Sequence, residues 1–176
     1  MKNILARQMR DLFSEQASLY QAEKGELVVE KVPLDLQALA KGLSERFSSH
    51  PSGEGKTLVV RFPEGPPPLR SDQNLVSRIL CNMVTNALEA SRPGATVEVD
   101  CQIEAASAKF TVHNPGAILE EVVPRMFQRS FSTKTDPGHG LGTYSMRLFA
   151  EQYLGGKVTF TTSMEEGTTF ILMLPI

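Results

Sequence analysis

The longest periodic stretch of the sequence runs from Ser71 to Ser91, and it constrains the fold more than any other feature. Its apolar residues recur at the i, i+3, i+4 and i+7 spacing of a helix with one broad buried face. They are Leu75, Val76, Ile79, Leu80, Met83, Val84, Ala87 and Leu88. Ser71 or Asp72 can cap the start of this helix, and Pro93-Gly94 ends it. Such a face predicts burial against another layer of the fold.

Alternating apolar and polar residues mark most of the remaining elements. The sequence predicts strands at 26–32, 56–62, 96–103, 109–112, 157–162 and 168–174. It predicts helices from about Asp35 to Phe47, over 141–153 and, for one or two turns, near 120–127. Too many strands are joined by hairpin turns for a doubly wound parallel sheet. We therefore expect an α+β fold, with two layers, one mixed and largely antiparallel sheet, and helices on one face.

An N-terminal helix is predicted over residues 3–24. Its narrow apolar seam consists of Leu5, Met9, Leu12 and Leu19, with Gln16 at the remaining seam position. Gly25 is a suitable residue to end it. This pattern is typical of one arm of a coiled coil or helical hairpin. The alternative is a helix that simply packs on the following domain.

Composition excludes several classes of protein. The 176 residues suit one domain with a short appendage, and the net charge of −2 gives no basic footprint for nucleic acid. No apolar run approaches the roughly 20 residues of a membrane span, so we expect no membrane contact by this chain. Cys81 and Cys101 lie in apolar segments and match no metal spacing, which favours reduced thiols in a cytoplasmic protein.

Three glycines two residues apart, Gly138, Gly140 and Gly142, precede the last expected helix. Glycine is unfavourable inside helices and strands, but it lets backbone N–H groups come close to an anion. A glycine-rich loop that opens onto a helix N-terminus is a phosphate site, because free N–H groups and the helix dipole both point at the anion. The loop therefore predicts a bound nucleotide. Gly55-Lys56-Thr57 is not a P-loop, since His50 stands where that motif needs glycine.

Arg78, Asn82 and Asn86 lie four residues apart and share one stripe beside the apolar face of the long helix. Asparagine is a poor residue for a helix interior, so two of them on a partly buried stripe need an explanation. Amide oxygens suit a hard cation such as Mg²⁺ that also bridges phosphates. The alternative is a pair of amides that only form hydrogen bonds or face solvent.

Five segments resemble, in the same order, the sequence boxes of sensor histidine kinases, which share a superfamily with gyrase and MutL ATPases. They are Asn82-Met-Val-Thr-Asn-Ala-Leu-Glu-Ala90 (N box), Asn114-Pro-Gly-Ala-Ile118 (G1), Phe127-Gln-Arg-Ser-Phe131 with Ser132-Thr-Lys134 (F), Gly138-His-Gly-Leu-Gly142 (G2) and Gly167-Thr-Thr-Phe170. Each box is a weak signal alone, whereas their common order is specific. The resemblance covers residues 25–176 and implies the histidine-kinase-like ATPase fold, with an ATP lid.

The resemblance implies a role for individual residues. Asn86 and Asn82 would hold Mg²⁺, and Asn82, Lys134 and Arg129 would act on the terminal phosphates. Further contacts to ATP would come from Asn86, Asn114, Gly116, Ile118, Phe127, Phe131, Gly138, Gly140, Leu141, Gly142, Thr143 and Thr168. Asn114 stands where the family usually has an aspartate that accepts a hydrogen bond from adenine, and an amide oxygen can also accept it. The G1 segment is one residue short, so His113 is the alternative at that position.

The residue type at position 82 bears on the reaction. In the gyrase and MutL branches a glutamate that activates water stands four residues before the metal asparagine, whereas Asn82 cannot act as a general base. The resemblance thus implies transfer of the γ-phosphate of Mg-ATP to a histidine, in a two-component system with a response regulator. A nucleotide-dependent docking module and a serine kinase of the anti-sigma type are the alternatives.

The phosphoacceptor is expected outside this chain. None of His50, His113 and His139 is predicted to lie on a helix beside an acidic residue, so we expect no autophosphorylation by the chain alone. By the resemblance, residues 1–24 would be a remnant of the dimerisation and phosphotransfer hairpin. Residues 25–176 would be the catalytic domain of a protein that is a homodimer at full length.

Overall fold

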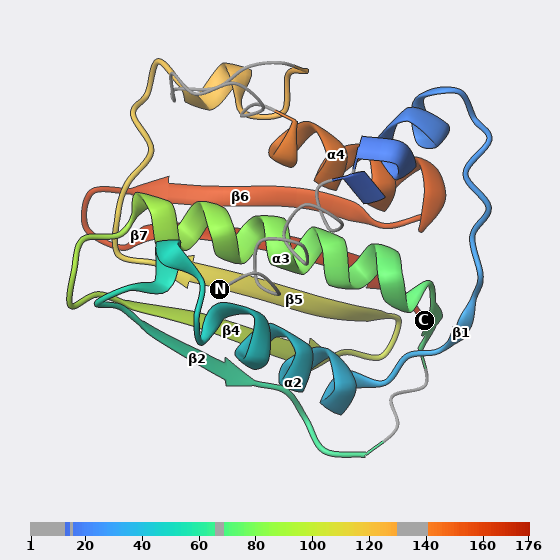
Figure 1. The fold of residues 1–176 in the computed structure, drawn as a ribbon, viewed down its shortest axis with the longest axis horizontal. Helices are drawn as coiled ribbons and strands as arrows, with labels where there is room; N and C mark the ends of the chain where they lie inside the picture. The colour runs from blue at the N-terminus through green and yellow to red at the C-terminus, as the bar shows by residue number, and fades with distance from the viewer. Residues whose placement is uncertain (1–12, 15, 66–68, 130–140) are drawn as a thin grey trace.

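The computed structural model describes residues 13–14, 16–65, 69–129 and 141–176 (Figure 1). The strands are β1 (Val32–Pro33), β2 (Thr57–Arg61), β3 (Arg70–Ser71), β4 (Thr96–Ile103), β5 (Ser107–Asn114), β6 (Lys157–Ser163) and β7 (Gly167–Pro175). The helices are α2 (Leu36–Phe47), α3 (Gln73–Ala90) and α4 (Gly142–Leu148), which continues as a π-helix, η3 (Phe149–Tyr153). Two short 3-10 turns are η1 (Pro51–Gly53) and η2 (Val123–Arg125).

Five strands form one mixed sheet in the order β2-β4-β5-β7-β6. β2 pairs in parallel with β4, and the other three pairings are antiparallel. α2, α3 and α4 lie on one face of this sheet (Figure 1). The predicted α+β architecture is confirmed, including its mixed sheet and the single helical layer.

The core lies between α3 and the sheet. All eight apolar residues expected on the buried face of α3 are buried, and they meet inward-facing residues such as Phe110 and Leu172. Asp72 caps α3, because its side chain accepts hydrogen bonds from the backbone N–H groups of Asn74 and Leu75, a contribution of about 1 kcal/mol. Cys101 is a buried free thiol, as expected, and burial raises its pKa to about 12.

One predicted element is wrong. The strand expected at 26–32 is reduced to Val32–Pro33, which pairs only with Arg70–Ser71 in a separate small sheet. Val28 is 87% exposed while Leu27 and Val29 pack partly against the core, so this stretch keeps the alternation of a strand. Among the described residues, it pairs with no other strand before Val32. The helix of one or two turns expected near 120–127 is present as a single short turn, η2. Pro124 lies at the start of this turn, where its missing backbone N–H is tolerated.

The described part of the N-terminal helix, residues 16–23, packs on the domain beside α4 (Figure 1). Leu19 and Ala22 are buried in the common core, and the Tyr153 hydroxyl donates a 2.6 Å hydrogen bond to the Ala22 carbonyl. This stretch therefore packs on the following domain, as the alternative to a coiled-coil arm predicts. The coiled-coil seam itself stays a prediction, because Leu5, Met9 and Leu12 lie outside the described residues.

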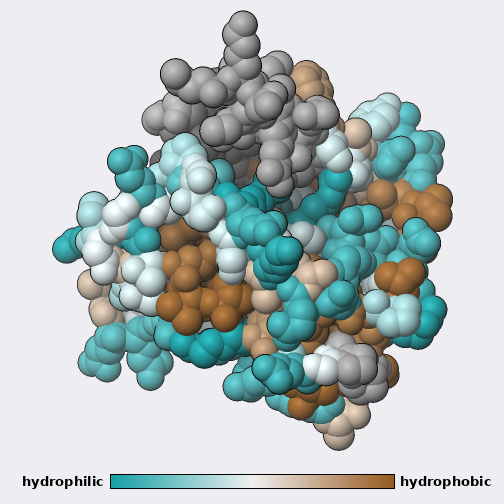
Figure 2. Space-filling view, turned by 60° about the horizontal axis from the view of Figure 1, so that its bottom comes forward, coloured by the Kyte–Doolittle hydropathy of each residue, from teal (hydrophilic) through white to brown (hydrophobic). Residues whose placement is uncertain are grey.

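The molecular surface mixes polar and apolar residues. On the face in Figure 2, hydrophobic patches are bordered by hydrophilic residues. Within the described ranges, no helix combines the length and the apolar character that crossing a bilayer requires.

Candidate nucleotide-binding site

The middle of α3 meets the start of α4, which brings Asn82 of the N box next to Gly142, the last residue of the G2 box. The Asn82 amide nitrogen donates a 3.2 Å hydrogen bond to the Ser145 hydroxyl, which in turn donates a 2.9 Å hydrogen bond to the Gly142 carbonyl. Leu141 and Thr143 flank Gly142 and are half-buried. The first turn of α4 thus lies against the polar stripe of α3.

Asn86 lies one turn further along α3 and is half-buried, like Asn82. Among the residues that the structure describes, no three His, Cys, Asp or Glu side chains gather to hold a metal ion. The donors that this part of α3 offers are therefore neutral amide oxygens. Mg²⁺ accepts such a sparse set, because it keeps several waters and binds through the phosphates of its nucleotide.

A second polar cluster joins the ends of β5, β6 and β7. The Asn114 amide nitrogen and the Thr168 hydroxyl both donate to the Gly116 carbonyl, at 3.2 and 2.7 Å. The Thr162 hydroxyl lies 2.9 Å from that of Thr168 and accepts a 2.9 Å hydrogen bond from the Ile118 backbone N–H. This cluster holds four predicted base contacts together, namely Asn114, Gly116, Ile118 and Thr168.

Asn114 and His113 point to opposite faces of the sheet. Asn114 is 1% exposed on the helical side, whereas the His113 ring lies 3.0 Å from the Thr169 hydroxyl on the other side. A Cβ atom on Gly116 would lie 3.0 Å from the Ala90 carbonyl oxygen, so this cluster adjoins the C-terminal end of α3. The geometry therefore favours Asn114 over His113 as the residue beside a bound base.

Phe127 and Arg129 lie within the segment expected to form the lid, which starts near Gly116. The Phe127 ring packs 5.8 Å from that of Phe160, and the Arg147 guanidinium lies 5.7 Å from its centre. Arg129 forms an ion pair with Glu23 of the N-terminal helix, at 2.6 Å between Nε and Oε1. A phosphate contact by Arg129 would require this ion pair to open, and that role stays a prediction.

Lys134, Phe131, Gly138 and Gly140 lie outside the described residues.

The Glu23–Arg129 pair predicts a dependence on pH. The hydrogen bond from Arg129 lowers the pKa of Glu23 against the opposing effect of burial, and the Tyr144 hydroxyl adds to the lowering. The ion pair therefore stabilises the domain fully above the ordinary glutamate pKa of about 4.3, and this contribution is lost as pH falls through the lowered pKa.

We expect Glu23→Gln to reduce the free energy of unfolding at pH 7, and we expect the difference from the unaltered chain to be smaller at about pH 3. Chemical denaturation at both pH values measures this difference. Glu26→Gln, at an exposed position three residues away, is the control and should change little. A difference for Glu23→Gln that is the same at both pH values would contradict the assignment.

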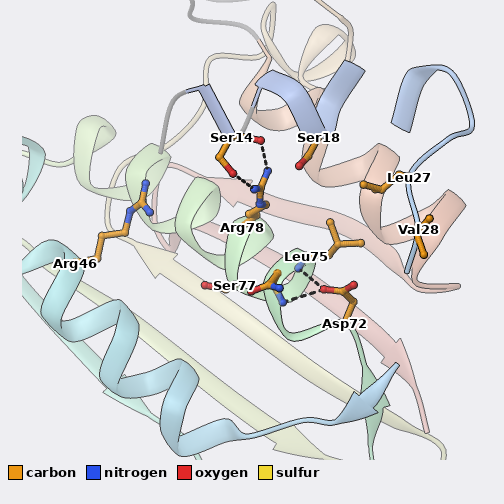
Figure 3. Close-up of a pocket in the computed structure, with 10 residues that line it drawn as sticks. Ser14, Ser18, Leu27, Val28, Arg46, Asp72, Leu75, Ser77 and Arg78 are labelled. Atoms are coloured by element: carbon orange, nitrogen blue, oxygen red, sulfur yellow. Dashed lines mark hydrogen bonds between the residues drawn. The ribbon is translucent and has the colours of Figure 1, made fainter. Parts of the chain in front are cut away.

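A cavity of about 480 Å³ opens elsewhere, between the N-terminal helix and the first half of α3 (Figure 3). Its polar wall includes Arg78, whose guanidinium donates to the Ser14 carbonyl and hydroxyl oxygens at 3.0 and 2.6 Å. None of the residues predicted to bind ATP lines it. Arg78 belongs to the same stripe as Asn82, but in this structure it holds the N-terminal helix.

Sequence reasoning missed two residues of these clusters. Ser145 joins Asn82 to α4, and Thr162 joins the lid segment to β6 and β7. A small hydroxyl residue in a short helix carries no pattern of its own. Thr162 had one signal, since it ends a predicted strand on the same side as Phe160 and Val158.

The fold and the site together define an α+β domain with three features. Helix α3 carries Asn82 and Asn86, helix α4 begins at Gly142, and a polar cluster lies at one end of the sheet. The family model of the histidine kinase-, DNA gyrase B- and HSP90-like ATPases matches residues 71–176, more than half of the chain. The chain belongs to this family, so the resemblance stated from the sequence boxes is confirmed. ATP is the nucleotide of the family.

Curated relatives are sensor histidine kinases. CusS of Escherichia coli O6:H1 is 29% identical over 175 residues, which are 95% of this chain and 35% of that protein. Hik2 of Thermosynechococcus vestitus is 28% identical over 149 residues, which are 81% of this chain and 39% of that protein. The chain thus spans less than half the length of these two relatives.

Solved structures show the same fold. The catalytic domain of histidine kinase ThkA has a TM-score of 0.71 at 24% identity, covering 83% of this chain and 97% of that chain. Full-length ShkA in complex with AMPPNP has a TM-score of 0.78 at 19% identity, over 96% of this chain and 36% of that one. ThkA in complex with the response regulator protein TrrA has a TM-score of 0.74 at 22% identity, over 99% of this chain and 48% of that one.

Proposed function

We propose that this chain is the ATP-binding catalytic part of a sensor histidine kinase, which transfers the γ-phosphate of Mg-ATP to a histidine outside the chain. The observation that carries the proposal is the residue at position 82. Asn82 lies against the first turn of α4, where the phosphates of a nucleotide bound at the G2 loop would end. Its amide cannot remove a proton from water, so the site favours transfer over hydrolysis.

The chain's own residues have three tasks in this reaction. The cluster of Asn114, Gly116 and Thr168 binds the base at the sheet end, with the Asn114 amide nitrogen held by Gly116 so that its oxygen is the atom left for adenine. Backbone N–H groups at the start of α4 bind phosphate oxygens. Lys134 of the lid would bring a mobile positive charge to the terminal phosphates.

Asn86 and Asn82 would hold the metal ion. Their amide oxygens fit Mg²⁺, and the bound ion would neutralise phosphate charge as in other phosphoryl transfers. The protein's contribution to such a transfer is mostly position and charge, which is consistent with a site that offers amides, backbone N–H groups and one lid lysine.

The domain division and the partners belong to the same proposal. Residues 1–24 are the end of the hairpin that carries dimerisation and phosphotransfer, and residues 25–176 are the catalytic domain. The likeness to histidine kinases such as ThkA, which was solved with the regulator TrrA, supports a response regulator as the partner downstream of the phosphohistidine. The natural protein then acts in the cytoplasm as a homodimer.

A phosphorylation assay tests the proposal. We expect the purified chain, incubated with Mg-ATP labelled at the γ-phosphate, to acquire no phosphohistidine and to release little phosphate. We expect it to phosphorylate a histidine of the natural full-length protein when that protein's own site is disabled by Asn86→Ala.

Two results would overturn the proposal. One is phosphohistidine on the isolated chain. His50 lies in a loop and His113 on a sheet face, so neither lies on a helix as the expected phosphoacceptor does. The other is rapid ATP hydrolysis without any acceptor, because it would show a base for water that Asn82 does not provide.

A further inference from the structure

We propose that Ser145 is a positioning residue, which orients the Asn82 amide so that its oxygen faces the metal and phosphates. The inference rests on the proposed function, because it needs a nucleotide and a metal ion at this site. It assigns a role to a residue outside the five sequence boxes, in the first turn of α4.

The direction of both hydrogen bonds carries the inference. Ser145 has a single hydroxyl proton, and the 2.9 Å contact to the Gly142 carbonyl uses it, because a carbonyl can only accept. Toward Asn82, 3.2 Å away, the Ser145 oxygen can then only accept a hydrogen bond. The Asn82 side chain must therefore present its NH₂ group to Ser145 and its oxygen elsewhere.

The remaining geometry shows where that oxygen lies. A Cβ atom on Gly142 would be 3.9 Å from both Oδ1 and Cγ of Asn82, so the amide oxygen lies over the first residue of α4. Ser145 itself is only 6% exposed, which removes competing water from its hydroxyl. Without the serine oxygen, the two orientations of the Asn82 amide would become closer in energy. In one of these orientations the NH₂ group, instead of the oxygen, would face the cation.

The effect should therefore appear in the metal dependence of nucleotide binding. The readout is the ratio of the ATP dissociation constants without and with Mg²⁺, measured by calorimetry. Partners that orient metal ligands commonly contribute 10–100-fold to metal affinity, and we expect Ser145→Ala to lower this ratio about tenfold. Metal-free binding should change little.

Two controls separate positioning from a structural role. Ser91→Ala removes a comparable bond, because Ser91 is also buried and donates a 2.6 Å hydrogen bond to the Ala87 carbonyl. It should leave the ratio unchanged. In an Asn82→Ala background, Ser145→Ala should have no further effect on the ratio, since a residue that acts through Asn82 has nothing left to orient.

The outcomes are distinct. An unchanged ratio in Ser145→Ala, an equal loss in Ser91→Ala, or additive losses with Asn82→Ala would each overturn the role of Ser145. Absence of ATP binding by the unaltered chain would instead overturn the proposed function itself.

Discussion

Gly167→Ala is expected to destabilise the domain by about 2–4 kcal/mol and to weaken ATP binding as well. Gly167 begins β7 with φ at 76°, in the left-handed region that favours glycine. A Cβ atom there would overlap the carbonyl oxygen of Asn114 and lie 2.7 Å from the Cα of Pro115. The alanine therefore forces apart the two strand ends that hold the base cluster.

A second glycine supplies the control. Gly155 has nearly the same φ, 67°, but a Cβ atom on it meets nothing within 4 Å. Gly155→Ala should cost only the backbone strain of about 1–2 kcal/mol and leave ATP affinity unchanged. Denaturant unfolding and ATP titration of both variants measure the difference. Equal losses in the two variants would show that the backbone contact with Asn114 does not hold the site.

Asn86→Ala is expected to abolish most of the tightening of ATP binding by Mg²⁺. Loss of a partner that only orients a metal ligand costs 10–100-fold, so loss of the ligand itself should cost at least about 100-fold of the metal-dependent affinity. Metal-free ATP binding should fall much less, because the base cluster is formed by other elements, β5, β6 and β7.

Asn74→Ala is the matched control for that variant. Asn74 lies on the same helix, three turns before Asn86, and is exposed beside the cavity under the N-terminal helix. Its replacement by alanine should leave the affinity for ATP unchanged, both with and without Mg²⁺. Equal losses of metal-free and metal-dependent binding in Asn86→Ala would make Asn86 a structural residue.

The elements with a regular period were predictable from the sequence. The apolar face of α3 and the alternation of β4 required only the helical and strand periods, and β4 was predicted with the bounds that it has. The strand expected at 26–32 failed because alternation does not reveal whether a partner strand exists. Leu27 and Val29 pack partly against the core, but within the described residues only Val32–Pro33 of this stretch pairs with another strand.

The candidate site was predictable where motifs mark it. Asn82 and Gly142 were both named, but their proximity depends on how α4 packs on α3, which no local pattern encodes. Contacts between distant segments were missed for the same reason, as the pair Glu23–Arg129 and the link Thr162–Thr168 show. Ser145 was missed because a single serine in a helix has no distinguishing neighbours in sequence.

The central claim is that the chain binds ATP through a metal-assisted site on α3 and α4. Calorimetric titration of the unaltered chain with ATP, with and without Mg²⁺, tests it most directly. The account predicts saturable binding of one ATP per chain that Mg²⁺ tightens. Absence of binding at millimolar ATP, or binding of equal strength with and without Mg²⁺, would contradict it.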